Sequence, residues 1–191
     1  MSQLRMIWHG EESMKIKPKG FHIIDRTAKS YAKEQLADGW LYACAPLIDE
    51  TWDRAKFYET MWNDPAIPED AIFFAVTPAG KIFSTAAAQI LADGTGNMHM
   101  VGTNGECRGM GGGMAVCHAV VEYFRRHGIT KAYLRTDDFR LSAIKIYLAL
   151  GYHPYLTEKD MPERWQRIME NLALKELAAY DSDENPVTLQ V

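Results

Sequence analysis

The chain has 191 residues, 47% of them hydrophobic and 24% charged, which is typical of one globular domain with a substantial core. Its formal net charge of -4, without a basic stripe, argues against a nucleic-acid partner. Cys44, Cys107 and Cys117 form no C-x-x-C pair and favour free thiols in a reducing compartment. Neither a membrane-spanning run nor a signal-peptide core is evident, so we expect a cytoplasmic protein without a membrane partner.

The first half of the chain predicts two helices and then an antiparallel meander. A short strand is expected over residues 21–25, and Asp38-Gly39 ends the first helix. The turn Pro78-Ala79-Gly80 joins two apolar, β-rich segments into a hairpin. The expected helices cover residues 27–37 and 49–62, and the meander strands cover 71–77, 81–90 and 97–101.

The second half predicts helices that alternate with strands. Helices are expected over 109–127, capped by Gly128, over 139–150, opened by Asp138 and closed by Gly151, and from Asp160-Met161-Pro162 onward; strands are expected over 131–136 and 152–156. Residues 181–191 are acidic and aperiodic, so we expect a flexible tail after a single domain over residues 1–180. This order predicts a mixed α/β sheet and not a doubly wound parallel one.

The most informative segment is the glycine-rich run over residues 100–113. A strand ends, a loop carries Arg108, and a helix begins on Gly109, Gly111, Gly112 and Gly113. A helix start offers unpaired N–H groups and partial positive charge, and glycines let an anion approach them. Together these features predict a diphosphate-binding site.

Other interpretations of this loop remain. A P-loop would need Lys and then Ser or Thr where Met114-Ala115 follow Gly113, so that interpretation fails. A dinucleotide-binding fold would need a third glycine where Met114 stands, although Asp137 or Asp138 falls where a ribose-binding acid would sit. A dinucleotide-binding oxidoreductase and a glycine-rich turn without a ligand therefore stay as alternatives.

The segment from Arg108 to Gly113 resembles the Arg/Gln-x-x-Gly-x-Gly/Ala pyrophosphate loop of the GNAT superfamily, the acyl-CoA-dependent N-acetyltransferases. Residues 140–152, with Ala143, Tyr147 and Gly151, resemble the family's Asn-x-x-Ala-x-x-x-Tyr-x-x-x-Gly-Phe segment. The resemblance is strong over about residues 98–155, and only topological before them. Two motifs in the right order, separated by one helix and one strand, are more specific than either alone.

The sequence departs from this family pattern at three positions. Gly105 replaces a common proline. Gly112 replaces a common Ile or Leu, which predicts looser packing at the helix start. Arg140 replaces an Asn that often contacts the cofactor, so that contact is not carried over.

The resemblance implies a mixed, mostly antiparallel central sheet flanked by helices. It also implies an N-acetyltransferase that moves an acetyl group from acetyl-CoA to an amine of an unidentified small acceptor by direct attack in a ternary complex. Tyr147 would be the catalytic general acid for the departing thiolate. The cofactor-binding residues would be Val101, Thr103, Arg108, Gly109, Met110, Gly111, Gly112, Gly113 and Ala143.

The general base is left open. His99 and Glu106 lie near the right place in the sequence, but a strand histidine that faces away and a solvated carboxylate are the plainer interpretations. His99, Cys107, Cys117 and His118 match no zinc spacing, so we expect no metal. Trp40, Trp52 and Trp62 line an acceptor pocket or pack in the core. A homodimer is plausible for the family, and a non-catalytic acyl-CoA-binding domain of the same fold remains an alternative.

Overall fold

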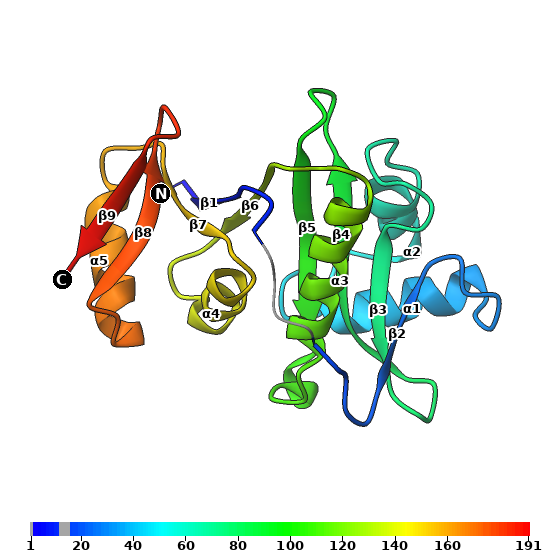
Figure 1. The fold of residues 1–191 in the computed structure, drawn as a ribbon. Helices are drawn as coiled ribbons and strands as arrows, with labels where there is room; N and C mark the ends of the chain where they lie inside the picture. Colours follow the sequence, from blue (N-terminus) through cyan, green and yellow to red (C-terminus); the bar gives the residue numbers. More distant parts are fainter. Residues whose placement is uncertain (1, 12–15) are drawn as a thin grey trace. The chain divides into compact units, whose positions relative to one another are not determined.

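The computed structural model of the protein describes residues 2–11 and 16–191, which form two compact units. The larger unit contains residues 16–129, and the smaller unit combines residues 2–11 with residues 130–191. Both units mix helices with strands, and their strand pairs are mostly antiparallel, as predicted (Figure 1). None of the described helices is long and apolar enough to cross a bilayer.

The sheet of the larger unit is the predicted meander, with the short strand predicted over residues 21–25 added at one edge. Its strands lie in the order β2 (His22–Asp25), β3 (Ile72–Val76), β4 (Ile82–Ile90) and β5 (Gly96–Thr103), and each pairs antiparallel with its neighbour. All five residues of β3 are buried, so both faces of this sheet are covered. The hairpin of β3 and β4 and the third strand β5 are confirmed.

Helix α1 (Lys33–Cys44) differs from the prediction at both ends. The backbone N–H of Ala32 donates to Gln35 Oε1 at 2.8 Å just before the helix begins. Gly39, the predicted stop, lies inside the helix. A Cβ at Gly39 would come within 2.5 Å of the Ile82 side chain, so this glycine permits close approach to β4 and does not end the helix.

The second predicted helix is also shorter than expected. Asp49 Oδ1 accepts hydrogen bonds from the N–H and hydroxyl of Thr51, which fold this stretch into a turn. Helix α2 (Arg54–Phe57) begins only after Asp53, whose Oδ1 accepts from Lys56 N at 2.8 Å. It continues as a π-helical turn, η1 (Tyr58–Trp62).

Helix α3 (Gly112–Arg126) covers β3 to β5 on the face opposite α1 (Figure 1). The ring of Tyr123 on α3 packs edge-on against the ring of Phe73 on β3, with centroids 6.1 Å apart. Phe73 pairs with Ala86, whereas the next residue back along β4, Thr85, pairs with Gly102. Successive strand residues face opposite sides, so Gly102 faces away from α3.

The smaller unit has β1 (Leu4–Trp8) between β6 (Ala132–Thr136) and β7 (His153–Leu156), antiparallel to both. Strand β7 then pairs in parallel with β8 (Glu176–Asp181). Strands β6 and β7 confirm the prediction, whereas β1 and β8 were not predicted. The buried pattern of β1 lacks the strict alternation that marks a half-exposed strand.

The expectation of a loose tail over residues 181–191 does not hold, because residues 186–190 form strand β9 (Pro186–Gln190), antiparallel to β8. Asp181 Oδ1 accepts from the backbone N–H of Asp183 and Asn185 at 2.9 Å each, which makes the turn between the two strands. Val187 and Leu189 then alternate with polar residues along β9, a pattern too short to stand out from the acidic residues before it.

The helices of the smaller unit are α4 (Leu141–Ala149) and α5 (Met161–Leu172). Asp138 does not cap α4 as predicted. Its carboxylate instead accepts from Arg164 Nη2 at 2.5 Å and Nε at 2.9 Å, and Arg140 holds the position before the helix. The guanidinium of Arg164 holds the pKa of Asp138 below its usual range. Gly151 has φ 86°, as expected for the end of α4.

Candidate functional site

Strand β5 carries a β-bulge shortly before its end. The register passes from Ala87–His99 to Thr85–Gly102, so Met100 and Val101 together oppose one residue of β4. Met100 has φ 47°, in the left-handed region that few residues other than glycine adopt. A bulge interrupts the ladder and bends the strand, and it leaves one residue without a partner there. The bulge therefore coincides with Val101, one of the residues predicted to bind the cofactor.

The strand end beyond the bulge is fixed to β4 by side chains. The Ser84 hydroxyl is buried and donates to the Gly102 carbonyl at 2.9 Å, and it lies 2.6 Å from Thr103 Oγ1. Val101 and Thr103 are half-buried on β5. The end of β5 that carries Val101 and Thr103 is therefore held against β4.

Asn104 anchors the loop that leaves β5. Its side-chain oxygen accepts from Glu106 N at 3.0 Å, and its amide donates to the Tyr42 carbonyl at 2.9 Å. Its backbone N–H donates to Phe83 O at 3.0 Å. Sequence reasoning missed this residue. An Asn directly after a strand and before a glycine was the available signal, since Asn side chains often bond to the backbone two residues on.

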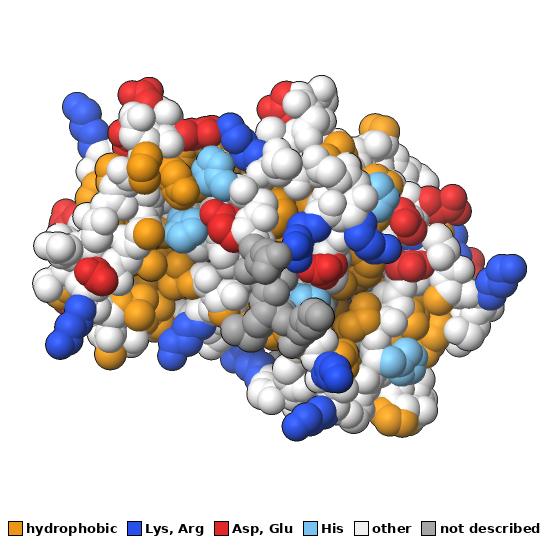
Figure 2. Space-filling view, viewed as in Figure 1, with side chains coloured by type: hydrophobic (Ala, Val, Ile, Leu, Met, Phe, Trp, Pro, Cys, Tyr) orange, Lys and Arg blue, Asp and Glu red, His pale blue; other side chains and the backbone are white. Residues whose placement is uncertain are grey.

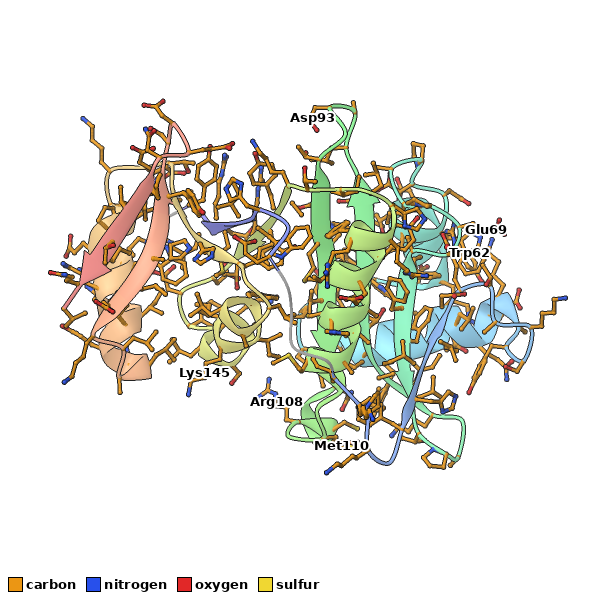
Figure 3. The ribbon with its side chains drawn as sticks, viewed as in Figure 1. Trp62, Glu69, Asp93, Arg108, Met110 and Lys145 are labelled. Atoms are coloured by element: carbon orange, nitrogen blue, oxygen red, sulfur yellow. The ribbon has the colours of Figure 1, made fainter. Side chains whose placement is uncertain are left out.

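After Asn104 the chain makes one 3₁₀ turn, η2 (Gly105–Cys107), and then reaches the glycines. Gly109 and Gly111 have φ 83° and 84°, and a Cβ at either would meet nothing within 4 Å. These two glycines are therefore required by backbone conformation and not by crowding. Arg108 and Met110 are exposed on this loop (Figure 3).

Gly112 serves a different purpose. A Cβ there would lie 2.3 Å from Phe83 Cε2 and 3.0 Å from Ser84 Cβ. The expectation that Gly112 loosens the helix start is wrong, because its missing side chain lets α3 begin directly on β4. The helix start is thereby held next to the strand that pairs with the bulged β5.

The start of α3 has the properties of an anion site. The first helical bond runs from Ala115 N to Gly111 O at 3.1 Å. The N–H groups of Gly112, Gly113 and Met114 precede it and have no carbonyl in a preceding helical turn. The dipole of a 15-residue helix and the nearby guanidinium of Arg108 both favour negative charge here. The chain thus gathers the loop residues predicted to bind the diphosphate of acetyl-CoA.

The remaining predicted site residues lie in the smaller unit. Ala143 and Tyr147 are one turn apart on α4, and Tyr147 is 6% exposed. The Tyr147 ring packs edge-on against Tyr152 with centroids 6.4 Å apart. Arg140, just before the helix, forms an ion pair with Asp137 at 2.8 Å. The joint action of α4 and the glycine loop on one cofactor stays a prediction.

The two candidate bases differ in their surroundings. His99 is half-buried on β5; burial lowers its pKa, and the negative charge of Asp64 opposes that shift. Glu106 is exposed, and its Oε2 accepts from the Tyr42 hydroxyl at 2.9 Å. Lys81 Nζ lies over the Tyr42 ring at 4.2 Å. Glu106 thus belongs to a surface cluster on the loop, as its plainer interpretation predicts.

The cysteines are free thiols. Cys44 and Cys117 are buried, which raises their pKa, and Cys107 is half-buried. Within residues 2–11 and 16–191, no group of three His, Cys, Asp or Glu side chains is placed to hold a metal ion.

Of the three tryptophans predicted to line a pocket or pack in the core, Trp40 is buried, whereas Trp52 and Trp62 are half-buried. Trp40 is fully buried; its ring stacks on Trp52 with centroids 5.6 Å apart and packs at a tilt against Phe57 with centroids 5.2 Å apart. Trp62 is only half-buried, and the ammonium of Lys33 lies 4.8 Å from its ring centroid. The aromatic cluster therefore holds η1 and α1 together on one face of the sheet.

Three solved structures illustrate the fold. A GCN5-related N-acetyltransferase from Kribbella flavida is 21% identical, with TM-score 0.56, over 81% of this chain and 55% of that chain. Another GCN5-related N-acetyltransferase, from Sphaerobacter thermophilus, is 20% identical, with TM-score 0.57, over 80% of this chain and 49% of that chain. Glucosamine-6-phosphate N-acetyltransferase from Arabidopsis thaliana is 16% identical, with TM-score 0.50, over 66% and 89%. The matched part of this chain spans about half the length of the first two proteins.

No curated protein matches the chain. The model of the acetyltransferase (GNAT) family, however, matches residues 36–152, which is more than half of the chain. That range contains the meander, the bulged strand, the glycine loop, α3 and α4. The chain therefore belongs to the acetyltransferase (GNAT) family.

Proposed function

We propose that this protein transfers the acetyl group of acetyl-CoA to an amine of a small acceptor by direct attack in a ternary complex. The observation that carries the proposal is the path from the bulge at Val101, through the loop that Asn104 anchors, to the glycine start of α3. It offers a diphosphate site at one end and interrupted strand pairing at the other. Family membership supports acetyl transfer in general.

For each step of the proposed reaction, the chain has a group that would carry it out. The backbone N–H groups of Gly112, Gly113 and Met114 at the start of α3, together with the side chain of Arg108, would hold the diphosphate. The backbone of Val101 would donate to the thioester oxygen as it becomes an oxyanion. Tyr147 would give a proton to the departing thiolate. A phenol has a pKa of about 10 and a thiol a pKa of about 8.5, so transfer of a proton from the phenol to the thiolate is unfavourable in free energy. The site must therefore assist that transfer.

The acceptor is proposed as a small-molecule amine. The Arabidopsis neighbour is a glucosamine-6-phosphate N-acetyltransferase, so an amine acceptor suits this fold. On the face in view in Figure 2, Lys and Arg side chains lie among acidic and apolar ones and are not gathered into a stripe. That nucleic acid is not the partner stays an expectation from the sequence. Cytoplasmic location and a homodimer stay predictions.

The alternatives predict different ligands. A non-catalytic acyl-CoA-binding domain would bind acetyl-CoA and release no CoA with any amine. A dinucleotide-binding oxidoreductase would bind NADH, but its nucleotide site needs a parallel βαβ unit, and the strands before α3 form an antiparallel meander.

Calorimetric titration with acetyl-CoA, CoA and NADH tests the proposal. We expect micromolar binding of acetyl-CoA, about -8 kcal/mol, and none of NADH. Release of free thiol is then followed with a panel of glucosamine, spermidine, phenethylamine and a lysine peptide. Thiol release with an amine supports the transferase. Binding without release from any amine supports the non-catalytic domain, and no binding of acetyl-CoA refutes both.

A further inference from the structure

A chain of polar side chains crosses β4 and β5 close to the bulge. Asn97 Nδ2 donates to Gln89 Oε1 at 2.6 Å, and Gln89 Nε2 donates to Asp64 Oδ2 at 2.7 Å. Asp64 Oδ1 also accepts from Ala66 N at 2.9 Å, which fixes the carboxylate at the end of the chain. These bonds hold Asp64 in place beside the sheet face that also carries His99.

The strand register places His99 on that face. His99 and Asn97 are two residues apart on β5 and therefore share a side of the sheet. His99 pairs with Ala87, and Gly102 pairs with Thr85, two residues away on β4. Despite the bulge between them, His99 and Gly102 therefore face the same side.

That side is covered by α1, because a Cβ at Gly102 would lie 2.7 Å from Cys44 Sγ of that helix. Since α3 covers the opposite face, the proposed diphosphate site and His99 lie on opposite sides of the strand. His99 is two residues from Val101 on β5, with the bulge residue Met100 between them. An amine that approaches the thioester from the α1 side would therefore approach on the side of the strand that carries His99.

The charges around His99 suit a proton acceptor. Burial lowers its pKa below the ordinary value, which favours the neutral ring. The carboxylate of Asp64 acts against that shift and keeps the ring more basic than burial alone would allow. Cys44, which faces the same side from α1, is kept as a neutral thiol, because burial raises its pKa. A neutral, half-buried imidazole beside one carboxylate is an arrangement found in general bases.

From this geometry we propose that His99 is the general base of the acetyl transfer and that Asp64 is a positioning residue that tunes it. The inference rests on the proposed function and adds the base that the sequence leaves open. It also assigns the α1 side of β5 as the side from which the amine enters.

The step is balanced in atoms and charge. The lone pair of the neutral amine forms a bond to the thioester carbonyl carbon, and its nitrogen becomes cationic and acidic. His99 takes one proton from that nitrogen. The C–S bond then breaks, the amide forms, and the thiolate takes a proton from Tyr147. Solvent exchange returns the proton on His99 to water and restores the phenol, so the products are the N-acetyl amine and CoA.

The first test is His99→Gln, with His22→Gln as the matched control. His22 is an exposed histidine on β2 of the same unit. With the best amine of the panel, we expect His99→Gln to lower kcat by about 100-fold or more while calorimetry shows the same affinity for acetyl-CoA. We expect His22→Gln to keep the parent rate. In the parent protein kcat/KM should rise with pH as His99 loses its proton, and this acid limb should vanish in His99→Gln.

Asp64→Asn tests the same assignment without changing His99. This test can be carried out even if His99→Gln does not fold. Without the carboxylate, the pKa of His99 falls, so the acid limb should move to lower pH. The inference is overturned if the acid limb of the pH profile stays in place in Asp64→Asn. It is also overturned if His99→Gln folds and keeps both its rate and its acid limb. Either result leaves the proposed function intact. A parent protein that acetylates no amine overturns the proposed function, and this inference with it.

Discussion

Gly112 of α3 lies so close to Phe83 of β4 that a Cβ on the glycine would come within 2.3 Å of the aromatic ring. Both residues are buried, and a phenyl ring packed between a sheet and a helix has little room to move. This contact sets the position of the α3 start relative to β4, and with it the position of the proposed diphosphate site.

Gly112→Ala should therefore be destabilising although alanine favours helices. We expect a loss of about 1–3 kcal/mol in the free energy of unfolding, because overpacking displaces Phe83 or the helix start. Urea denaturation measures the loss, and calorimetry should show weaker acetyl-CoA binding. Gly113→Ala, at the next and half-buried position, is the control. Equal stability of the two variants would show that the close contact is relaxed in solution.

Gly111→Glu should abolish acetyl-CoA binding, because it places a carboxylate where the diphosphate would lie. The matched control is Gly94→Glu in the turn between β4 and β5. Gly94 has φ 82° against 84° for Gly111, and a Cβ at either position meets nothing within 4 Å. Both variants carry similar backbone strain and the same charge, so only position differs. Parent affinity in Gly111→Glu would refute the loop assignment.

Tyr147→Phe should retain acetyl-CoA binding and lower kcat by about 100-fold, since it removes a proton donor and keeps the ring that packs on Tyr152. Tyr155→Phe is the control, because its hydroxyl donates to Ser182 O at 3.3 Å in the same unit. Steady-state rates of thiol release compare them. An unchanged kcat in Tyr147→Phe would remove Tyr147 from its proposed role and leave it as a core aromatic residue.

Asp138→Asn should destabilise the protein in a pH-dependent way. The pKa of Asp138 is lowered in the folded state by Arg164, which is 5% exposed, so its contribution is present above the unfolded pKa of about 4 and is lost as pH falls through the folded value. We expect a loss of only about 1–2 kcal/mol at pH 7, since the Asp138 side chain is 39% exposed. Urea denaturation at pH 7 and pH 3 should show the difference shrinking at the lower pH. A difference independent of pH would mean that packing and not charge is lost.

Sequence reasoning succeeded where a local pattern carries the structure. The meander from Ile72 onward follows from apolar, β-rich runs separated by glycine turns, and the glycine start of α3 follows from four glycines after a strand. It failed for the glycines, because a glycine can be required for either of two structural reasons. Gly39 and Gly112 are required by contact with β4, whereas Gly109 and Gly111 are required by positive φ. Only the partner residue, far away in the sequence, tells these cases apart.

The unpredicted parts of the site have the same origin. The bulge at Met100 depends on how β5 pairs with β4, and the role of Asn104 depends on the carbonyl of Tyr42, more than sixty residues earlier. The face that His99 occupies follows from a register that no single segment reveals. Side-chain type was readable from the sequence, but side-chain direction was not.

Strand β1 also has a consequence for the order in which the molecule is made. The larger unit is continuous in sequence and can fold as soon as residue 129 has left the ribosome. Strand β1 is synthesised before the larger unit, yet its partners β6 and β7 begin only at Ala132 and His153. During synthesis this apolar strand therefore remains unpaired while the larger unit folds. Contacts between residues so distant in sequence form slowly, so closure of the smaller unit should be the late step of folding.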